Sequence, residues 1–411
     1  MAQFRKWTHL FLSNYLGVFN DNFLKNSIIF VALGWQLPAW LNESQLISIV
    51  SSCLVLPYLI FSPYGGRLAA IHKKKKVFVV FKLLEIPVLI LAAVAFYFQW
   101  IYIAILSVLI MGILSSMYSP SKYGLIRDIG GKEGVSYGSG GFEMMAFLGI
   151  LTGTIVASVI SDTYSDQLFS AVLMVVAVLG YIVTKKIEVT EQPVELTDDL
   201  KTDPFRFVVA TFRFARQHRF VNSSVLGAAS FWLIGSMVQM NLIIHSACVY
   251  HASNTQTGLI MGCAALGIAA GTYVAGVISG KQVKKGLILP GLAGMILMLA
   301  LLTFVHLNWY LYIVVVFVTT FSGGLFQIPN LSVIQQTDLG RKAGDVFAYL
   351  NIVTFVLLLL GAVLFSLTTK LTNQNSYAVF GVITLVSMAV GAYFLLVSPD
   401  YRNETTKLLK S

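Results

Sequence analysis

Long apolar runs of roughly 18–28 residues fill almost the whole chain, with short polar joints between them. A helix needs about 20 mostly apolar residues to cross the hydrocarbon core of a bilayer. Lipid cannot hydrogen-bond to exposed backbone groups, so only helices and closed barrels cross it, and these runs lack the two-residue alternation of barrel strands. Only 11% of the 411 residues are charged, whereas soluble domains average about 25%. The sequence therefore predicts an all-α integral membrane protein.

The joints between the apolar runs differ in charge. Lys and Arg are concentrated in every second joint, and the joints between these carry almost none. Under the positive-inside rule, this asymmetry places both termini in the cytoplasm. The net charge of +10 then reflects membrane orientation and contact with the lipid bilayer, and no nucleic-acid partner is expected. Twelve spanning helices are expected, at about 9–37, 45–64, 77–97, 101–120, 138–161, 167–184, 221–248, 255–280, 287–305, 309–328, 346–369 and 376–398.

The two halves of the chain repeat each other at a nearly constant offset. Pro120 and Pro329 are 209 positions apart, and so are Gly131 and Gly340. Both pairs follow or end the fourth and tenth runs, which are equivalent if each half has six helices. Two six-helix halves in parallel orientation are the architecture of the major facilitator superfamily, whose binding site lies near the bilayer midplane between the halves.

One long polar connection, residues 187–220, separates an N-terminal half at 1–186 from a C-terminal half at 221–411. Its segment DPFRFVVATFRFARQHRF has two interpretations. It is either an amphipathic basic helix that lies on the inner membrane surface or a solvated helix that joins the two bundles.

The joint after the second run, GGRLAAIHKKKK, is similar to the cytoplasmic loop motif of the superfamily, Gly-x-Leu-Ala-Asp followed by basic residues. Ala70 stands where the motif has the aspartate that helps to latch the inner side shut. The resemblance implies gating residues in this joint and in the joints after the fourth and tenth runs. These are Gly66, Arg67, Lys74, Lys132 and Arg341.

Ionisable residues inside the runs occur only in the first half, at Asp21, Lys25, Lys82, Glu85 and Glu143. A charged residue at the centre of a membrane helix costs about 2.5–3.5 kcal/mol, so such residues are usually paired or line a wet cavity. Asp21 and Lys25 are four positions apart and can pair on one helix face. Glu143 either binds substrate or is half solvated at the start of its helix, and Lys82 either binds substrate or extends to the interface.

Three asparagines, Asn14, Asn22 and Asn26, extend the Asp21–Lys25 pair into a polar strip on the first helix. This strip is expected to line the central cavity, because a pair that only fixes helix packing rarely has three asparagines beside it. The packing pair is the alternative interpretation.

Further polar candidates lie beside prolines and aromatic residues. In YSPSKYGLIRD, Pro120 is expected to end or kink the fourth helix, and Lys122 and Tyr123 follow in an inner joint. Lys122 is either an anion contact or an ordinary basic loop residue. In the second half, Trp232 and Gln239 suit an amphiphilic ligand, although they also suit plain helix packing.

Several stretches together resemble one branch of the superfamily: LGVFNDNFLKN, FKLLE, YSPSKYGLI, SFWLIG and GGLFQIPNLSVIQQ. They are similar to lysophospholipid transporters, including the membrane halves of fused acyltransferase–transporter proteins. The resemblance implies movement of lysophospholipids such as lysophosphatidylethanolamine from the outer to the inner leaflet of the bacterial inner membrane. It also implies a functional link to a separate acyltransferase that re-acylates them. The acidic residue of the family's first helix corresponds to Asp21, and its lysines correspond to Lys82 and Lys122.

The charged groups of the first half are therefore expected to recognise the headgroup, and the second half is expected to receive the acyl tail. No cofactor or metal is expected, and the protein is expected to act as a monomer. The expected substrate-binding residues are Asp21, Asn22, Lys25, Lys82, Lys122, Tyr123, Glu143, Trp232 and Gln239.

Three other functions compete with this prediction. A proton-coupled exporter of drugs or other amphiphiles would use Asp21 or Glu143 as its proton carrier. A membrane enzyme is not expected, because no His is followed five positions later by Asp, as in acyltransferases, and no phosphate-binding loop is present. A receptor that does not transport is the third alternative.

Overall fold

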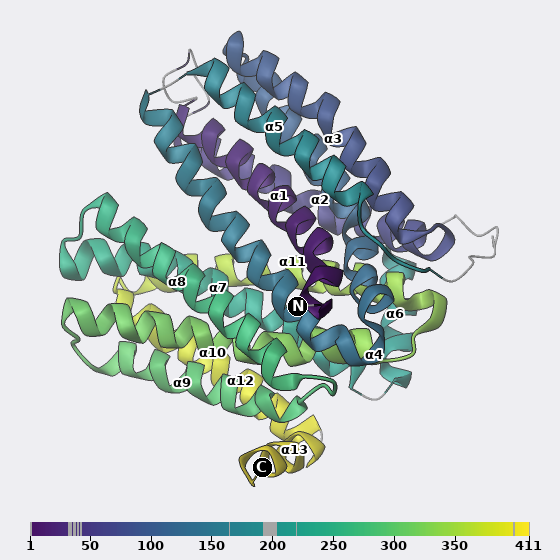
Figure 1. Cartoon of the computed structure of the whole chain (residues 1–411). Helices are drawn as coiled ribbons and strands as arrows, with labels where there is room; N and C mark the ends of the chain where they lie inside the picture. Colours follow the sequence, from purple (N-terminus) through teal and green to yellow (C-terminus); the bar gives the residue numbers. More distant parts are fainter. Residues whose placement is uncertain are drawn as a thin grey trace. The chain divides into compact units, whose positions relative to one another are not determined.

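The described part of the chain is almost entirely helical (Figure 1). The computed structural model describes residues 2–31, 35, 38, 41, 43–163, 165–191, 204–218, 220–397 and 399–410, and none of these lies in a β-strand. The helices are α1 (Ala2–Val31), α2 (Glu43–Ile71), α3 (Lys74–Tyr97), α4 (Ile101–Thr163), α5 (Asp166–Lys185), α6 (Pro204–Gln217), α7 (Val221–Tyr250), α8 (Asn254–Ser279), η2 (Lys285–Leu287), α9 (Ile288–Phe304), α10 (Trp309–Gln336), η3 (Gly340–Lys342), α11 (Ala343–Leu371), α12 (Ser376–Val397) and α13 (Pro399–Lys410).

Ten helices of the described chain are long and apolar enough to cross a membrane. α1, which holds the polar strip, is not among the ten, and α4 is counted once although a break divides it. The predicted all-α membrane fold is confirmed, and the chain is a multi-pass membrane protein. The count of twelve spans stays a prediction.

α4 differs from the two separate helices that were expected there. The helix does not end at Pro120 but continues to a break at Gly131, whose φ of 61° and ψ of −171° are open almost only to glycine. Proline is tolerated inside membrane helices where neighbouring groups satisfy the freed backbone carbonyl. Lys122 and Tyr123 therefore lie on a helix and not in a loop.

The residues that match in the sequence repeat have matching local structure. Gly131 and Gly340 both take a positive φ, 61° and 53°. Pro120 lies inside α4, and its counterpart Pro329 lies inside α10. The repeat therefore extends to the backbone conformation at these positions.

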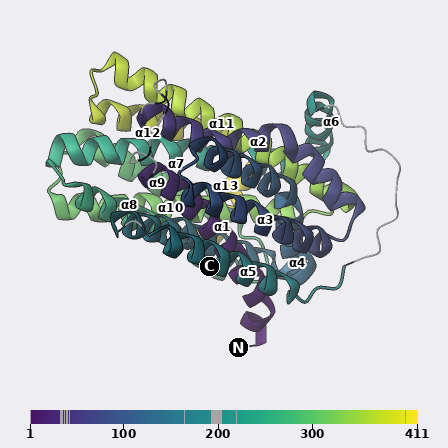
Figure 2. The ribbon, with the colours of Figure 1, turned by 90° about the horizontal axis from the view of Figure 1, so that it is seen from above.

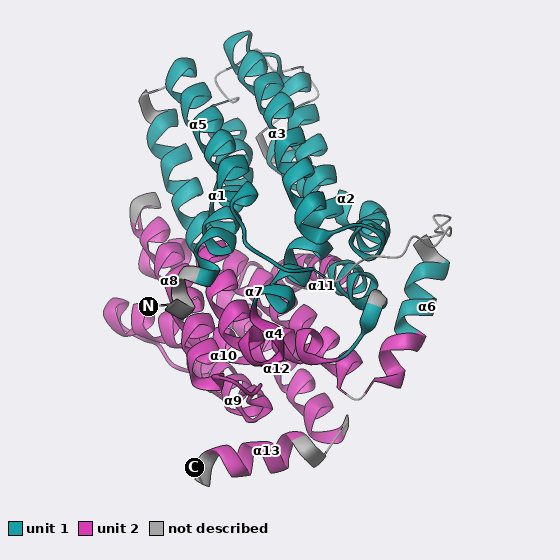
Figure 3. Cartoon of the chain, turned by 45° about the vertical axis from the view of Figure 1, so that its right-hand side comes forward, with its two compact units in different colours: residues 1–129, 148–212, 338–352 teal, residues 130–147, 213–337, 353–411 magenta. Residues whose placement is uncertain are grey.

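The chain divides into two compact units, which Figure 3 shows in different colours. Unit 1 holds residues 1–129, 148–212 and 338–352, and unit 2 holds residues 130–147, 213–337 and 353–411. α4 leaves unit 1 directly before Gly131 and returns to it after Phe147. The predicted boundary segment at 187–220 stays a prediction, and its residues 192–203 lie outside the described residues.

Aromatic stacking forms much of the core of unit 1. α5 lies beside both α1 and α3 (Figures 1 and 2). Phe169 of α5 stacks on Phe96 of α3 with ring centroids 3.7 Å apart and on Phe23 of α1 at 5.3 Å. These three helices therefore form one packed group, which positions the polar residues of α1 and α3.

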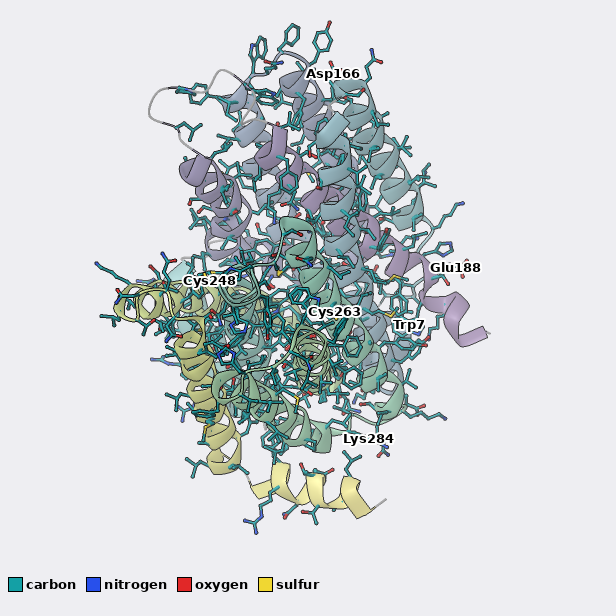
Figure 4. The ribbon with its side chains drawn as sticks, turned by 90° about the vertical axis from the view of Figure 1, so that its left-hand side faces the viewer. Trp7, Asp166, Glu188, Cys248, Cys263 and Lys284 are labelled. Atoms are coloured by element: carbon teal, nitrogen blue, oxygen red, sulfur yellow. The ribbon has the colours of Figure 1, made fainter. Side chains whose placement is uncertain are left out.

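In unit 2, α10 packs against α7, α8 and α9, and α12 packs against α7 and α9. The three cysteines are free. Cys248 at the end of α7 is exposed, and Cys263 of α8 is half-buried (Figure 4). Thiol-labelling experiments on this protein therefore need a background without the native cysteines.

Candidate functional site

A group of polar and charged side chains from α1, α3 and α4 is largely buried within unit 1. Residues three or four positions apart share one face of a helix, and this spacing aligns the members on each helix. We call this group the polar cluster. It consists of Asn14, Gly17 and Asp21 of α1, Lys82 and Glu85 of α3, and Ser115, Tyr118 and Lys122 of α4.

Lys82 and Glu85 form a buried ion pair at the centre of the polar cluster. The Lys82 Nζ atom lies 2.8 Å from each Glu85 carboxylate oxygen, and both residues are 2% exposed. The ammonium group lies against α1 at Gly17, where an added Cβ would be 2.6 Å from Nζ. A side chain at this position would displace the ammonium from its place, so α1 and α3 fit together around the pair.

Tyr118 contributes an aromatic ring between two lysines. The Lys82 Nζ atom is 5.1 Å from the ring centroid, and the Lys122 Nζ atom is 5.7 Å from it. The ring also stacks on Phe78 of α3 at 5.2 Å. Cations are attracted to the face of an aromatic ring, so Tyr118 stabilises both ammonium groups.

Asp21 makes one hydrogen bond and leaves one oxygen available. Ser115 donates to Asp21 Oδ2 at 3.2 Å, while the buried Oδ1 has no hydrogen-bond partner among the described residues. Its electrostatic neighbours include Glu85, Lys82 and Lys122. A buried acceptor without a partner is costly unless a ligand or water reaches it.

The ion pair that the spacing of Asp21 and Lys25 allows is absent from the described ion pairs. Lys25 instead donates to Asn22 Oδ1 at 3.4 Å, and Asn22 donates to the Val18 carbonyl at 2.8 Å. The bond from Ser115 of α4 holds the Asp21 carboxylate toward α4. Asn22 and Lys25 therefore lie beside the polar cluster on α1, next to Asp21 in the sequence.

Lys122 is the half-buried cation of the polar cluster. It donates to Asn14 Oδ1 at 3.2 Å, and its Nζ atom is also 5.9 Å from the centroid of the Tyr123 ring. Tyr123 in turn stacks on Phe347 of α11 with ring centroids 5.6 Å apart. An ammonium group beside aromatic rings and an amide oxygen can also donate a hydrogen bond to an anionic group.

The other predicted site residues belong to unit 2. Glu143 is 3% exposed on the second part of α4. Trp232 of α7 is half-buried and stacks on Phe147 at 5.8 Å, whereas Gln239 is exposed. The structure therefore brings together Asp21, Lys82 and Lys122, with Asn22, Lys25 and Tyr123 adjacent in the sequence. Glu143, Trp232 and Gln239 belong to unit 2.

Five members of the polar cluster were not among the predicted site residues: Asn14, Gly17, Glu85, Ser115 and Tyr118. A signal for two of them was present, since Ser115 and Tyr118 lie seven and four positions before Lys122 and so share its helix face. That signal becomes visible only when residues 118–128 are treated as helix.

Two of the predicted gating residues lie where α2 meets α11. A Cβ added at Gly66 would be 2.9 Å from the Ala348 Cβ atom, so the two helices approach closely. Arg67 is an electrostatic neighbour of Asp345, which is 9% exposed. Asp345 lies just before the predicted run at 346–369, and α11, which begins at Ala343, includes it in its first turn.

The other gating candidates lie on joints that the structure describes in part. Lys74 pairs with Asp128 of α4 at 2.7 Å, and Lys132 is exposed. The side chain of Arg341 lies outside the described residues. Between the same two joints, Arg127 of α4 forms an ion pair with Asp338, which lies in the segment before α11. Within the described residues, no group of three or more His, Cys, Asp or Glu side chains is placed to hold a metal ion.

The model of the Major Facilitator Superfamily matches residues 16–362 and 250–409. The chain belongs to this superfamily. Among curated proteins, it is similar to the lysophospholipid transporter LplT of Photorhabdus laumondii, with 24% identity over 395 residues that cover 93% of this chain and 94% of that protein. LplT of Serratia proteamaculans is 23% identical over 390 residues, with 93% of each chain covered.

Solved structures of the superfamily share the fold. The human organic anion transporter MFSD10 superposes with a TM-score of 0.72 at 12% identity, covering 95% of this chain and 99% of that one. A bacterial homologue of the iron transporter ferroportin, in an outward-facing state, gives a TM-score of 0.72 at 14% identity, covering 95% of this chain and 98% of that one. The two LplT proteins and MFSD10 are named as transporters, and this chain is a major facilitator transporter.

Proposed function

We propose that this transporter moves lysophospholipids from the outer to the inner leaflet of the bacterial inner membrane by alternating access, with both termini in the cytoplasm. The observation that carries this proposal is the polar cluster, in which the Lys122 ammonium and an Asp21 oxygen with no hydrogen-bond partner in the described part of the chain share one helical bundle. The similarity to LplT proteins along 93% of the chain supports the same substrate class.

The chemistry of the two groups suits a zwitterionic headgroup. The Lys122 ammonium is a donor for the substrate phosphate, since lysine binds phosphate as a point charge. Asp21 Oδ1 is an acceptor for the N–H groups of an ethanolamine ammonium. Together they bind lysophosphatidylethanolamine by its two opposite charges, and a separate acyltransferase then consumes the delivered lipid.

Uptake of labelled lysophosphatidylethanolamine tests the proposal in cells that lack their own lysophospholipid transporter. The wild-type protein is expected to restore uptake, and Asp21→Ala and Lys122→Ala are expected to lose most of it. Lys407→Ala is the control for removal of a positive charge, because the Lys407 side chain is 75% exposed on α13. Wild-type uptake no better than that of cells with an empty vector contradicts the proposal.

A proton-coupled exporter of amphiphiles is the second candidate, because the Asp21 Oδ1 atom that lacks a partner can also accept a proton. For that function, an uncoupler stops transport by the wild-type protein, and Asp21→Asn transports independently of the proton gradient. Lysophospholipid uptake that ignores the uncoupler excludes this alternative.

A further inference from the structure

We propose that Lys82 and Glu85 are positioning residues that do not contact the substrate. In this assignment they fix the ring of Tyr118, and that ring holds the Lys122 ammonium in place for the headgroup. The inference deepens the proposed function and rests on it for the role of Lys122. It changes the role of Lys82, which the family resemblance marks as a substrate lysine.

The first step is that Glu85 already neutralises Lys82. The Lys82 Nζ atom is 2.8 Å from both carboxylate oxygens, and both residues are 2% exposed. A substrate phosphate that took Lys82 would leave Glu85 as a buried carboxylate without its partner. Because an unpaired buried charge is strongly unfavourable, the pair is expected to stay closed during transport.

The second step is that the pair is fitted to its surroundings on α1. The Lys82 ammonium approaches Gly17 so closely that an added Cβ would be 2.6 Å from Nζ, and the ammonium would have to move to admit it. The same Cβ would be 3.7 Å from the Tyr118 hydroxyl. Gly17, Lys82 and Tyr118 therefore meet at one point where α1, α3 and α4 converge.

The third step is that one ring connects the two lysines. Tyr118 is stacked on Phe78 at 5.2 Å and has Lys82 5.1 Å and Lys122 5.7 Å from its centroid. The buried pair fixes the ring, and the ring contributes to the position of the Lys122 ammonium. Lys122 differs from Lys82 because it is half-buried and donates to the neutral Asn14 amide oxygen.

A double-mutant cycle on the buried pair tests this division of roles. The variants are Lys82→Met, Glu85→Leu and the double variant, which replaces both ions with apolar residues of similar size. Replacing a whole buried pair is often neutral, whereas removing one partner is destabilising. Purified protein is measured for its unfolding temperature in detergent and, in proteoliposomes, for the KM and maximal rate of lysophosphatidylethanolamine transport.

Each single variant is expected to unfold at a lower temperature and to transport poorly. The double variant is expected to unfold at a temperature near that of the wild-type protein. Its KM is expected to return most of the way to the wild-type value. Lys122→Ala is expected to raise KM by about tenfold or more at an unchanged unfolding temperature. If the double variant keeps the same KM defect as Lys82→Met although it regains stability, Lys82 contacts the substrate and the inference is overturned.

The ring of Tyr118 is tested separately by Tyr118→Phe and Tyr118→Leu. The first keeps the ring and the second removes it, so Tyr118→Leu is expected to have a KM about tenfold above that of Tyr118→Phe. Equal KM values for the two variants overturn the role of the ring.

The stability measurements separate this inference from the proposed function. If the wild-type protein carries no lysophosphatidylethanolamine, the proposed function fails, while the unfolding temperatures still test the pair. If the double variant then unfolds at a temperature no higher than that of the less stable single variant, Lys82 and Glu85 do not act as one unit.

Discussion

Arg127 of α4 and Asp338, in the turn before α11, form an ion pair that joins segments far apart in the sequence. Their side chains are 24% and 72% exposed, so the pair is worth about 0.2–1 kcal/mol. Arg127→Ala is therefore expected to raise the labelling rate of a cysteine at the buried Ser121 of α4 by up to about fivefold. The measurement uses a background without the native cysteines and a thiol reagent that does not cross membranes.

The control for this prediction is the exchanged pair, Arg127→Asp with Asp338→Arg. It restores the attraction with the charges reversed and is expected to label more slowly than Arg127→Ala. An exchanged pair that labels as fast as the single variant shows that the ion pair does not hold α4 to this turn.

The close approach of α2 and α11 predicts the effect of a single methyl group. Gly66→Ala places a Cβ 2.9 Å from Ala348 Cβ and 3.0 Å from the Gly344 carbonyl oxygen, so the helices must separate. Overpacking of this kind costs about 1–3 kcal/mol, and the unfolding temperature in detergent is expected to fall. Gly235→Ala on α7 is the matched control, because a Cβ there meets nothing within 4 Å. Equal unfolding temperatures for the two variants contradict the prediction.

The backbone conformation of Gly131 allows a prediction about protein stability that involves no steric clash. A Cβ at this position meets nothing within 4 Å, but its φ of 61° with ψ of −171° is strained for any other residue. Gly131→Ala is therefore expected to destabilise the protein by about 1–3 kcal/mol, as measured by its unfolding temperature against that of Gly235→Ala. An alanine variant as stable as this control means that the break in α4 does not depend on glycine.

The polar cluster predicts a headgroup-dependent effect of Asp21. Asp21→Asn is expected to lower transport of lysophosphatidylethanolamine by about tenfold, because a charge-assisted hydrogen bond to the ammonium is lost. Lysophosphatidylglycerol carries the same phosphate but no ammonium, so its transport is expected to change little. Lys122→Ala is expected to reduce both substrates alike, since both carry the phosphate. Equal losses for both substrates in Asp21→Asn contradict a contact between Asp21 and the amine.

The membrane fold was predictable because it depends on apolar run length, which the sequence contains directly. Asp21, Lys82 and Lys122 were each candidates from the sequence, since ions in membrane helices are favourable mainly where they face one another or water, but their meeting was not predicted. The hydrogen-bond and ion-pair partners within this group were not predicted either. The local spacing favoured a bond between Asp21 and Lys25, but a serine from another helix holds the carboxylate instead.

The path of α4 was predicted wrongly for a related reason. Proline is a strong helix breaker in water, and Pro120 was interpreted by that rule. The helix continues past Pro120 and breaks at Gly131, where only the backbone torsions reveal the change. The buried Asp345 was missed because the predicted start of its helix, at residue 346, excluded it by one residue.

The break at Gly131 is a property of the backbone and not of side-chain packing. α4 passes from one compact unit to the other beside this residue, and no neighbouring atom would obstruct a larger side chain there. The break therefore depends on a torsional region that glycine enters at little cost, and it needs no support from neighbouring side chains.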